Sequence, residues 1–316
     1  TNFRPMSQPP ETSTTRTGYV TLVGRPNAGK STLMNQLLGE HLSIVTPKAQ
    51  TTWQRVTGIL TTGTTQLIFL DTPGLLQARD LLQRAMLAAA LEALREADVV
   101  LLVVDATRFP DELDKERILT ALQDVSAPLH VALNKTDQAK EEALVSWERW
   151  VGKRPWGAKI HRISALAGEG TAPLLAALAA DLPAGPFLYP EDDVAVSPVR
   201  FFAAELVREP VFEQYDDEVP YSTFCVVEDF NEENDPVYIR VKVYVERGSQ
   251  KGILIGAGGR AIRELGQASR AKIEHFLGRR VYLDLWVKPL KSWRKNRARL
   301  GEMGFRVPED DAAGRP

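Results

Sequence analysis

The stretch that most constrains the fold is Gly24–Ser31, because its eight residues match the pattern G-x-x-x-x-G-K-S. An apolar run over residues 19–23 precedes it, and a helical pattern over residues 32–38 follows. This order of strand, glycine loop and helix predicts a phosphate-binding loop, in which backbone N–H groups and a helix N-terminus face one anion. A glycine-rich turn in an unrelated α/β domain is the alternative, and the flanking strand and helix disfavour it.

Within this loop we expect Lys30 to reach the β- and γ-phosphates of a nucleoside triphosphate, and the Ser31 hydroxyl to bind Mg²⁺. The glycines allow the backbone to approach the phosphates closely. The other residues of the loop are also assigned to nucleotide contacts: Gly24, Arg25, Pro26, Asn27, Ala28 and Gly29.

Composition limits the class of protein. A chain of 316 residues with one cysteine predicts two domains without a disulfide framework, as suits a reducing cytosol. No apolar segment approaches the roughly 20 residues that span a bilayer. Residues 1–17, rich in Thr, Ser and Pro, are expected to form a disordered leader. Residues 247–299 carry 14 Lys and Arg against three acidic residues, although the net charge of the chain is −2, and this asymmetry predicts an anionic partner.

Three further motifs follow the phosphate loop, and the first is a polar, threonine-rich loop over residues 43–54. In nucleotide switches a threonine in such a loop supplies a Mg²⁺ ligand that depends on the γ-phosphate. Thr51 and Thr52 are both candidates for this catalytic role, and the sequence leaves the choice between them open. We assign Thr52 to the metal together with Ser31 and Asp71.

The second motif ends an apolar strand and consists of Asp71, Thr72, Pro73 and Gly74. An Asp at this place organises Mg²⁺ in nucleotide hydrolases, and Gly74 can bring its N–H to a γ-phosphate because no Cβ intervenes. Leu75 stands where Ras-like switches carry a glutamine that orients the attacking water. Leucine cannot form that hydrogen bond, so we expect slow intrinsic hydrolysis that relies on another group, a bound ion or a partner.

The third motif follows another buried strand and consists of Asn134, Lys135, Thr136 and Asp137. The Asp137 carboxylate can accept from N1–H and the 2-amino group of guanine, whereas adenine offers no matching pair. Asn134 can join neighbouring loops, and the Lys135 stem can lie over the base. A later element is expected to give a backbone N–H to the guanine carbonyl oxygen: Ser164, Ala165 and Leu166. Strands alternate with helices throughout, which predicts an α/β P-loop NTPase, a Ras-like G domain with a mostly parallel sheet.

Proline and glycine are dense in residues 182–190, which predicts a linker between two domains. Beyond it the pattern predicts a helix over residues 198–208, an antiparallel strand pair over 219–230 and 236–246, and a last strand over 280–287. Before that last strand, Gly256–Gly259 forms a G-x-x-G loop with a helix on each side. This order is that of an α+β type II KH domain, whose loop clamps single-stranded RNA.

We assign the domains as a disordered leader (1–17), a G domain (18–182), a linker (183–197) and a KH domain with a basic tail (198–316). In the tail, Trp293 among cations suits stacking on bases, although a helix on a membrane surface would give a similar pattern. The residues assigned to RNA binding are Lys251, Ile255, Gly256, Ala257, Gly258, Gly259, Arg260, Lys288, Lys291 and Arg294.

With both halves considered, the chain resembles the Era family of bacterial GTPases, of the Era/TrmE type with a C-terminal KH domain. The resemblance covers residues 18–293 and rests on the motifs above, together with Lys48–Thr52, Pro220–Ser222 and Ile255–Gly259. It implies a cytoplasmic GTPase, peripherally associated with the inner membrane, that binds the 3′ end of 16S rRNA and assists maturation of the small ribosomal subunit. It also implies that Asn27 holds a potassium ion, which could substitute for the missing glutamine. We expect a monomer.

Two positions depart from the family pattern. Ala257 stands where a lysine is usual, which removes one phosphate contact, and Trp53 stands where an arginine is usual. The leading hypothesis is that GTP binding in the first domain gates RNA binding by the second. The alternatives are an RNA-binding scaffold that keeps guanine nucleotide as a non-hydrolysed structural ligand, and an ATPase. The complete nucleotide motifs disfavour the scaffold, and Asp137 disfavours the ATPase.

Overall fold

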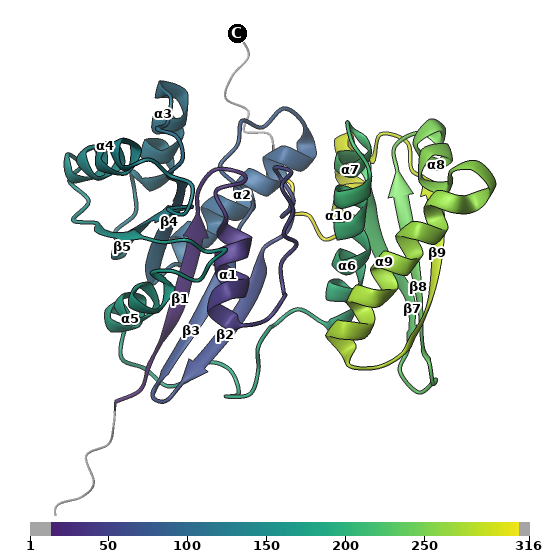
Figure 1. The fold of residues 1–316 in the computed structure, drawn as a ribbon, viewed down its shortest axis with the longest axis horizontal. Coiled ribbons are helices and arrows are strands. Elements are labelled where there is room, and N and C mark those ends of the chain that lie inside the picture. Colours follow the sequence, from purple (N-terminus) through teal and green to yellow (C-terminus); the bar gives the residue numbers. More distant parts are fainter. Residues whose placement is uncertain (1–13, 310–316) are drawn as a thin grey trace, which may run out of the picture.

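The computed structural model describes residues 14–309, which form two units, each with its own sheet (Figure 1). The leader expected over residues 1–17 falls mainly on residues 1–13, which lie outside the described residues, but its end is wrong, because Arg16 and Thr17 begin the first strand and pair with Thr65 and Gln66. Among the described residues, no helix is both long and apolar enough to cross a membrane.

The first unit is built on six strands in the order β2-β3-β1-β4-β5-β6. All neighbouring strands are parallel except β2 and β3, which form the expected hairpin around Gly63. The strands are β1 (Arg16–Val23), β2 (Val56–Thr62), β3 (Thr65–Asp71), β4 (Val99–Asp105), β5 (Leu129–Asn134) and β6 (Lys159–Arg162). Because β4 is buried from Val99 to Val104, the sheet needs helices on both of its faces.

Five helices supply this cover. The apolar sides of α1 and α5 pack in one core with β1, while α3 and α4 pack in a second core against the other side of β4 and β5. The helices are α1 (Lys30–Leu38), α2 (Leu81–Glu96), α3 (Glu112–Leu122), α4 (Glu141–Gly152) and α5 (Thr171–Asp181). No helix is predicted at α4 from the sequence, although Leu144, Trp147 and Val151 recur at helical spacing, and all three are buried in the structure.

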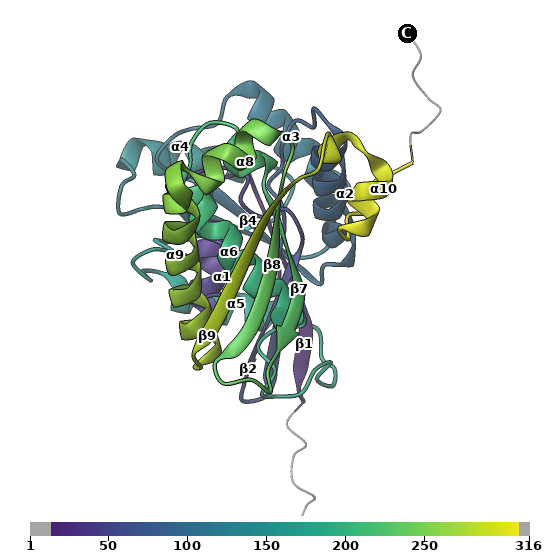
Figure 2. The ribbon, with the colours of Figure 1, turned by 90° about the vertical axis from the view of Figure 1, so that its right-hand side faces the viewer.

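The second unit has the expected order of one helix, two strands, two helices and one strand. Its sheet runs β7-β8-β9, with β7 antiparallel and β9 parallel to β8. In Figure 2 the strands face the viewer, and α6 and α9 lie behind them, toward the first unit. The elements are α6 (Val199–Gln214), α7 (Val219–Ser222), β7 (Phe224–Asn231), β8 (Val237–Val245), α8 (Gly248–Ile255), α9 (Arg260–Leu277), β9 (Val281–Pro289) and α10 (Arg297–Glu302), with single 3₁₀ turns η1 (Ala257–Gly259) and η2 (Trp293–Lys295).

Two local expectations in this unit are wrong. The strand expected from residue 219 begins only at Phe224, because Pro220 opens the short helix α7 and the Thr223 hydroxyl donates to the Val219 carbonyl. Helix α6 does not stop at Arg208 but continues past Pro210 to Gln214. An internal proline costs a helix about 3 kcal/mol, and here the burial of Phe212, which is fully inaccessible, offsets that cost.

The connection between the units, residues 183–197, is hydrogen-bonded to the first sheet at several points. It forms isolated bridges with the first sheet at Arg16–Ala184 and Gly58–Ala195, and the Ile59 N–H donates to the Val194 carbonyl at 2.9 Å. The Gln66 side chain accepts from two further backbone N–H groups of the connection, those of residues 188 and 189. Most of the connection is therefore packed along the edge of the first sheet.

A histidine pair joins β5, β6 and α5. His130 Nδ1 lies 3.0 Å from His161 Nε2, and His130 Nε2 lies 2.9 Å from the Asp181 carboxylate. The two rings stack with an interplanar angle of 9°. Burial lowers the pKa of both histidines below the ordinary value of 6.5, so the folded protein disfavours their charged forms.

We expect the free energy of unfolding to fall as the pH drops from 7.5 to 5.5. The unfolded chain takes up protons near pH 6.5 and the folded chain resists them, so stability is present above that pH and lost below it. Replacing His161 with Phe keeps a stacked ring but removes one titrating group, so the fall should become smaller. Urea unfolding at several pH values measures this, and an identical pH dependence in both proteins would contradict it.

Candidate nucleotide site and RNA surface

The phosphate loop connects the end of β1 to the start of α1. Its backbone takes positive φ at Gly24 (156°), Asn27 (61°) and Gly29 (92°). A Cβ at Gly24 would lie 2.1 Å from the Val103 carbonyl oxygen, and one at Gly29 would lie 2.2 Å from the Asn134 amide nitrogen. Both glycines are therefore required by the close approach of β4 and β5, as well as by the bend of the loop.

Three oxygen-bearing side chains converge at the N-terminus of α1. The Ser31 hydroxyl donates to Asp71 Oδ2 at 2.7 Å, and the Thr52 hydroxyl lies 3.0 Å from Ser31 Oγ and 3.4 Å from Asp71 Oδ2. Asp71 is fully buried, and its other oxygen, Oδ1, has no hydrogen-bond partner among the described residues. A buried carboxylate oxygen without a partner fits a cation, and hydroxyl and carboxylate oxygens are the donors that Mg²⁺ prefers.

The charges at this place depend on each other. Burial raises the pKa of Asp71, while Lys30 and the Ser31 hydroxyl act in the opposite direction. Burial likewise lowers the pKa of Lys30, and Asp71 opposes that effect. The Lys30 ammonium donates to the Arg25 carbonyl at 3.2 Å, which holds it inside the loop. The pair places one positive and one negative charge where phosphates and a metal would bind.

Thr51 and Thr52 play different parts in this structure. Thr52 presents its hydroxyl to Ser31 and Asp71, whereas the Thr51 carbonyl accepts a hydrogen bond from Arg208 of helix α6. The geometry therefore favours Thr52 as the metal ligand, a choice between the two threonines that the sequence leaves open.

The segment after β3 lies against the phosphate loop. The Thr72 hydroxyl donates to the Leu22 carbonyl at 2.7 Å, and the Leu75 N–H donates to the Gly24 carbonyl at 2.9 Å. A Cβ at Gly74 would lie 2.5 Å from the Pro26 nitrogen, so only glycine fits. Pro73 is buried beside it. The Leu75 side chain is 3% exposed and packs in the core with α3 and α4.

The base-selecting motif is organised by Asn134. Its amide donates to the Ala28 carbonyl at 2.9 Å, and its oxygen accepts from the N–H groups of Lys135 (2.8 Å) and Ala165 (2.9 Å). The Thr136 N–H donates to the Ile163 carbonyl at 3.1 Å. The Asn134 side chain thus connects the phosphate loop, its own loop over residues 134–137 (the base loop) and the Ser164–Leu166 element.

The other two members of the motif are Lys135 and Asp137. Lys135 donates to Asp105 at 2.6 Å and to the Asn27 carbonyl at 2.9 Å, which stretches its stem between the base loop and the phosphate loop. Asp137 is exposed, and hydrogen bonds from Ser164 and Gln138 lower its pKa, so it stays ionised and can accept two hydrogen bonds. Leu166 is 75% exposed at the rim.

Two cavities adjoin the phosphate loop, and Pro26 and Asn27 line both. The smaller, of about 40 Å³, lies among Lys30, Ser31, Thr52 and Gly74. The larger, of about 640 Å³, lies on the other side of Asn27 and is bounded by Leu75 and Arg25. Ser31 and Thr52, two of the three candidate metal ligands, line the smaller cavity.

The G-x-x-G loop has the conformation that its composition predicts. Gly256, Gly258 and Gly259 all have positive φ (70°, 59° and 74°). A Cβ at Gly256 would lie 2.7 Å from the Ala261 Cβ, whereas Gly258 has open space around it. Ala257, between α8 and α9, and Arg260, at the start of α9, are exposed. Lys251 and Ile255, both on α8, are partly exposed. The loop is thus open to a ligand backbone.

Part of the predicted RNA surface in the tail is wrong. Trp293 is fully buried, its indole N–H donates to the Ser222 carbonyl at 3.1 Å, and it packs on Trp53, so it cannot stack on bases. Arg294 pairs with Asp80 at 2.6 Å across the two units. Lys291 is exposed, and the Lys288 ammonium stands 5.5 Å from the centre of the exposed Trp286 ring.

Sequence reasoning also missed Arg208 and Glu209, which touch the loop carrying Thr52. Both are 1% exposed on helix α6. The available signal was their place within an otherwise apolar helix, since adjacent charged residues among buried positions need partners.

Comparisons with known proteins agree with this geometry. Residues 19–135 match a family model described as a 50S ribosome-binding GTPase, and residues 218–294 match a KH domain. A protein of Mesorhizobium japonicum named GTPase Era is 42% identical over 299 residues, covering 94% of this chain and 96% of its own. GTPase Era of Geobacter metallireducens is 40% identical over 292 residues, covering 92% and 98%.

Two solved structures are similar over both units. A single-residue variant of Aquifex aeolicus Era bound to GDP·AlF4⁻ superposes with a TM-score of 0.87 at 36% identity, covering 92% of this chain and 99% of that one. An Era complex with MgGDPNP and nucleotides 1506–1542 of 16S ribosomal RNA has a TM-score of 0.88 at 36% identity, with the same coverage.

Replacing Thr52 with Ala should weaken binding of the GTP analogue GDPNP in Mg²⁺ by about tenfold, because a metal contact worth about 1.4 kcal/mol is lost. GDP affinity should change little, since the contact depends on the γ-phosphate. Thr51→Ala is the matched control and should leave both affinities within about twofold, because only its carbonyl is used. Titration of fluorescent nucleotides measures this, and equal losses in the two variants would contradict the assignment.

Replacing Asp137 with Asn should lower GTP affinity by roughly 10- to 100-fold and raise affinity for xanthosine triphosphate. The amide can donate to the xanthine oxygen but cannot accept from both guanine donors. Competition binding with the two nucleotides reports the change, and unchanged guanine selectivity would remove Asp137 from this role.

Proposed function

Since the chain belongs to the Era family of GTPases, we propose that it is a GTP-dependent switch whose KH domain binds 16S rRNA near the 3′ end and which assists maturation of the small ribosomal subunit. The chain is a GTPase that converts GTP to GDP and phosphate. The observation that carries the proposal is the similarity, over 92% of the chain, to an Era structure that holds both MgGDPNP and 16S rRNA nucleotides. An inert nucleotide is not favoured, because a relative with the same fold binds GDP·AlF4⁻.

In the nucleotide site, Ser31, Thr52 and Asp71 are the residues that would hold Mg²⁺, supported by the buried, unpartnered oxygen of Asp71. Bound Mg²⁺ supplies positive charge to the phosphate oxygens. Lys30 neutralises the same phosphates, and the Gly74 N–H approaches the γ-phosphate from the facing segment. Because Thr52 belongs to a loop and Gly74 to a turn, both contacts depend on the triphosphate being bound.

Water activation in this protein needs a group other than Leu75, whose side chain is packed in the core. Asn27 is the candidate, as a residue that holds a potassium ion beside the γ-phosphate. Its position supports this role, because it has positive φ and lines both cavities next to the phosphate loop. A bound monovalent cation supplies positive charge to the developing transition state.

RNA would run along Gly256–Gly259, with Lys251 and Arg260 beside the backbone and Lys288 and Lys291 extending the basic surface. Their exposure supports this path. Arg294 is left out because Asp80 already pairs with it. The proposal also includes a cytoplasmic location, a weak peripheral association with the membrane and a monomeric state.

The domain limits are part of the proposal: a G domain over 18–182, a linker over 183–197 and the KH domain with its tail over 198–316. The separate sheets support this division, since each has its own core: one pair of cores lies around the first sheet, and another joins α6, α8 and α9 to the second sheet. Phe202 of α6 packs into the first pair, and a further cluster is shared by the two domains.

The protein alone should hydrolyse GTP slowly, faster in K⁺ than in Na⁺, and the 16S rRNA fragment 1506–1542 should accelerate it. Gly258→Asp should abolish the acceleration, because a carboxylate in the loop repels the RNA backbone. Phosphate release under multiple turnover measures both effects. Absence of turnover with any RNA or cation would contradict the proposed switch, and a scrambled RNA that accelerates equally would contradict the RNA assignment.

A further inference from the structure

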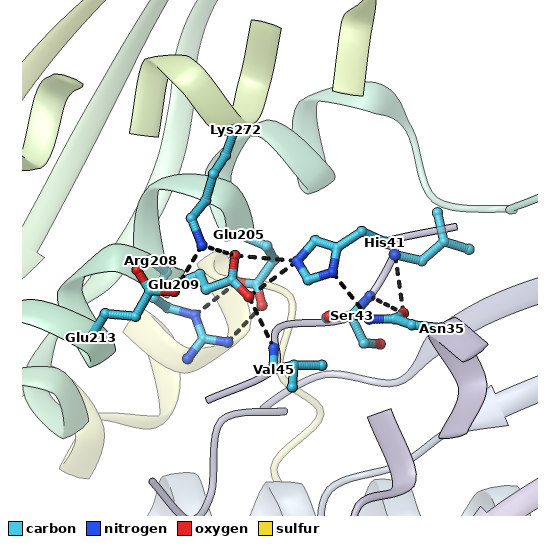
Figure 3. Close-up of polar contacts among 10 residues, drawn as sticks. Asn35, His41, Ser43, Val45, Glu205, Arg208, Glu209, Glu213 and Lys272 are labelled. Atoms are coloured by element: carbon cyan, nitrogen blue, oxygen red, sulfur yellow. Dashed lines mark hydrogen bonds and ion pairs between the residues drawn. The ribbon is translucent and has the colours of Figure 1, made fainter. Parts of the chain in front are cut away.

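The loop Ser43–Trp53 contains no helix or strand, so its shape depends on what it touches. Near its end stands Thr52, the candidate metal ligand. On its outer side the loop contacts helix α6 of the KH domain through several polar groups (Figure 3). Lys48 adds an ion pair with Asp216, just beyond the end of α6, at 2.8 Å.

Arg208 contacts both neighbours of Thr52, the backbone of Thr51 and the side chain of Trp53. Its Nη2 donates to the Thr51 carbonyl at 2.5 Å, and its guanidinium carbon stands 4.6 Å from the centre of the Trp53 ring. Glu205 fixes the guanidinium with two bonds of 2.6 and 2.8 Å. The Thr52 hydroxyl is therefore placed toward Ser31 by contacts that originate in the other domain.

Glu209, the next residue, holds the start of the same loop. Its Oε1 accepts from the Val45 N–H at 3.0 Å, and His41 Nε2 lies 3.1 and 3.2 Å from its two oxygens (Figure 3). Burial alone would raise the pKa of this carboxyl, but hydrogen bonds from His41 and Lys272 lower it to about 2. Glu209 is thus a buried anion that is satisfied partly by the loop.

The same carboxylate reaches the RNA-binding helix. Lys272, on α9, donates to Glu209 Oε2 at 2.8 Å and to Glu213 at 2.8 Å. Helix α9 begins directly after the G-x-x-G loop, at Arg260. A continuous set of contacts therefore runs from α9 through Lys272 and Glu209 to the Val45 backbone.

Buried charges make this connection sensitive to position. If the loop moved away, Glu209 would lose the Val45 N–H and Arg208 would lose the Thr51 carbonyl, and a charged group that loses a hydrogen-bond partner without regaining water is destabilised. The loop and α6 are therefore more stable in contact than at intermediate separations. Contacts of this kind can favour one of two positions of the loop relative to α6, and can therefore couple the nucleotide site to the G-x-x-G loop.

We propose that Arg208 and Glu209 are positioning residues through which the KH domain holds Thr52 in its metal-facing place, and that they couple triphosphate binding to RNA binding. The inference rests on the proposed GTP-dependent binding of RNA. It names the residues that couple GTP binding to RNA binding. The coupling is reciprocal, so RNA on the KH domain strengthens GTP binding by the same factor as GTP strengthens RNA binding.

The test compares full-length wild type with Glu209→Gln. Affinities for fluorescent GDPNP and GDP in Mg²⁺ are measured with and without the 16S rRNA fragment 1506–1542. In the variant, GDPNP affinity should fall about tenfold, within the range usual for coupled sites, while GDP affinity stays within about twofold. The gain in GDPNP affinity caused by RNA should shrink toward none. A merely structural role would weaken both nucleotides equally.

Glu213→Gln is the matched control. Glu213 bonds Lys272 at the same 2.8 Å, is 39% exposed, and makes no contact with the loop among the described residues. This variant should keep the GDPNP-to-GDP ratio and the RNA effect of wild type. A loss equal to that of Glu209→Gln would overturn the inference.

Because Glu209 is buried, a second variant guards against a folding defect. His41→Ala changes a side chain that is 46% exposed and removes one contact from the loop side. It should shift the GDPNP-to-GDP ratio in the same direction by a smaller factor, and its melting curve shows whether the fold is kept. If wild type bound RNA equally well with GDPNP and with GDP, the proposed switch would be overturned. If wild type bound RNA more tightly with GDPNP than with GDP, and Glu209→Gln showed the same difference, this inference alone would be overturned.

Discussion

A buried charge is tolerated in a protein only when it is paired, and two adjacent buried charges determine how the two domains of this molecule meet. Arg208 and Glu209 lie on a helix of the KH domain and pair there with Glu205 and Lys272, and each takes a further hydrogen-bond partner from the backbone of the G domain. An apolar cluster beside them, with Trp53 and Leu82 from one domain and Phe224 and Trp293 from the other, supplies the burial. The apolar contact favours association in general, while the charges select one geometry.

The nucleotide site is also held together by side-chain hydrogen bonds between separate segments of the chain. Asn134 bonds the phosphate loop and the Ser164–Leu166 element at once, so the parts that would hold phosphate and base move as one body. The loop carrying Thr52 is held from both sides, by Asn35 and Ser31 of the G domain and by Arg208 and Glu209 of the KH domain. On the proposed function, this loop is the part of the site that depends on the triphosphate.

Most of the fold could be predicted from the sequence because its signals are local. The phosphate loop, the buried run of β4 and the alternation along β8 each depend on near neighbours in the chain. The predictions that were wrong depend on distant contacts. Trp293 has the sequence context of a surface aromatic among cations, but Trp53, 240 positions earlier, buries it.

The departure at Trp53 gains an explanation from the same contact. Its ring packs on Phe224 and Trp293 and receives the Arg208 guanidinium on its face. No pattern within residues 43–54 indicates these partners, because all of them come from the second domain. For the same reason the choice between Thr51 and Thr52 needed the structure.

The connection between the domains has a further effect. Strand β2 is the last strand of the first sheet, and its outer side would present unpaired backbone groups that can recruit strands from other molecules. Val194 and Ala195 of the connection lie along that side and bond it. The segment that tethers the RNA-binding domain therefore also shields an aggregation-prone edge. A G domain that ended before residue 194 would leave this part of β2 open to pairing with strands of other molecules.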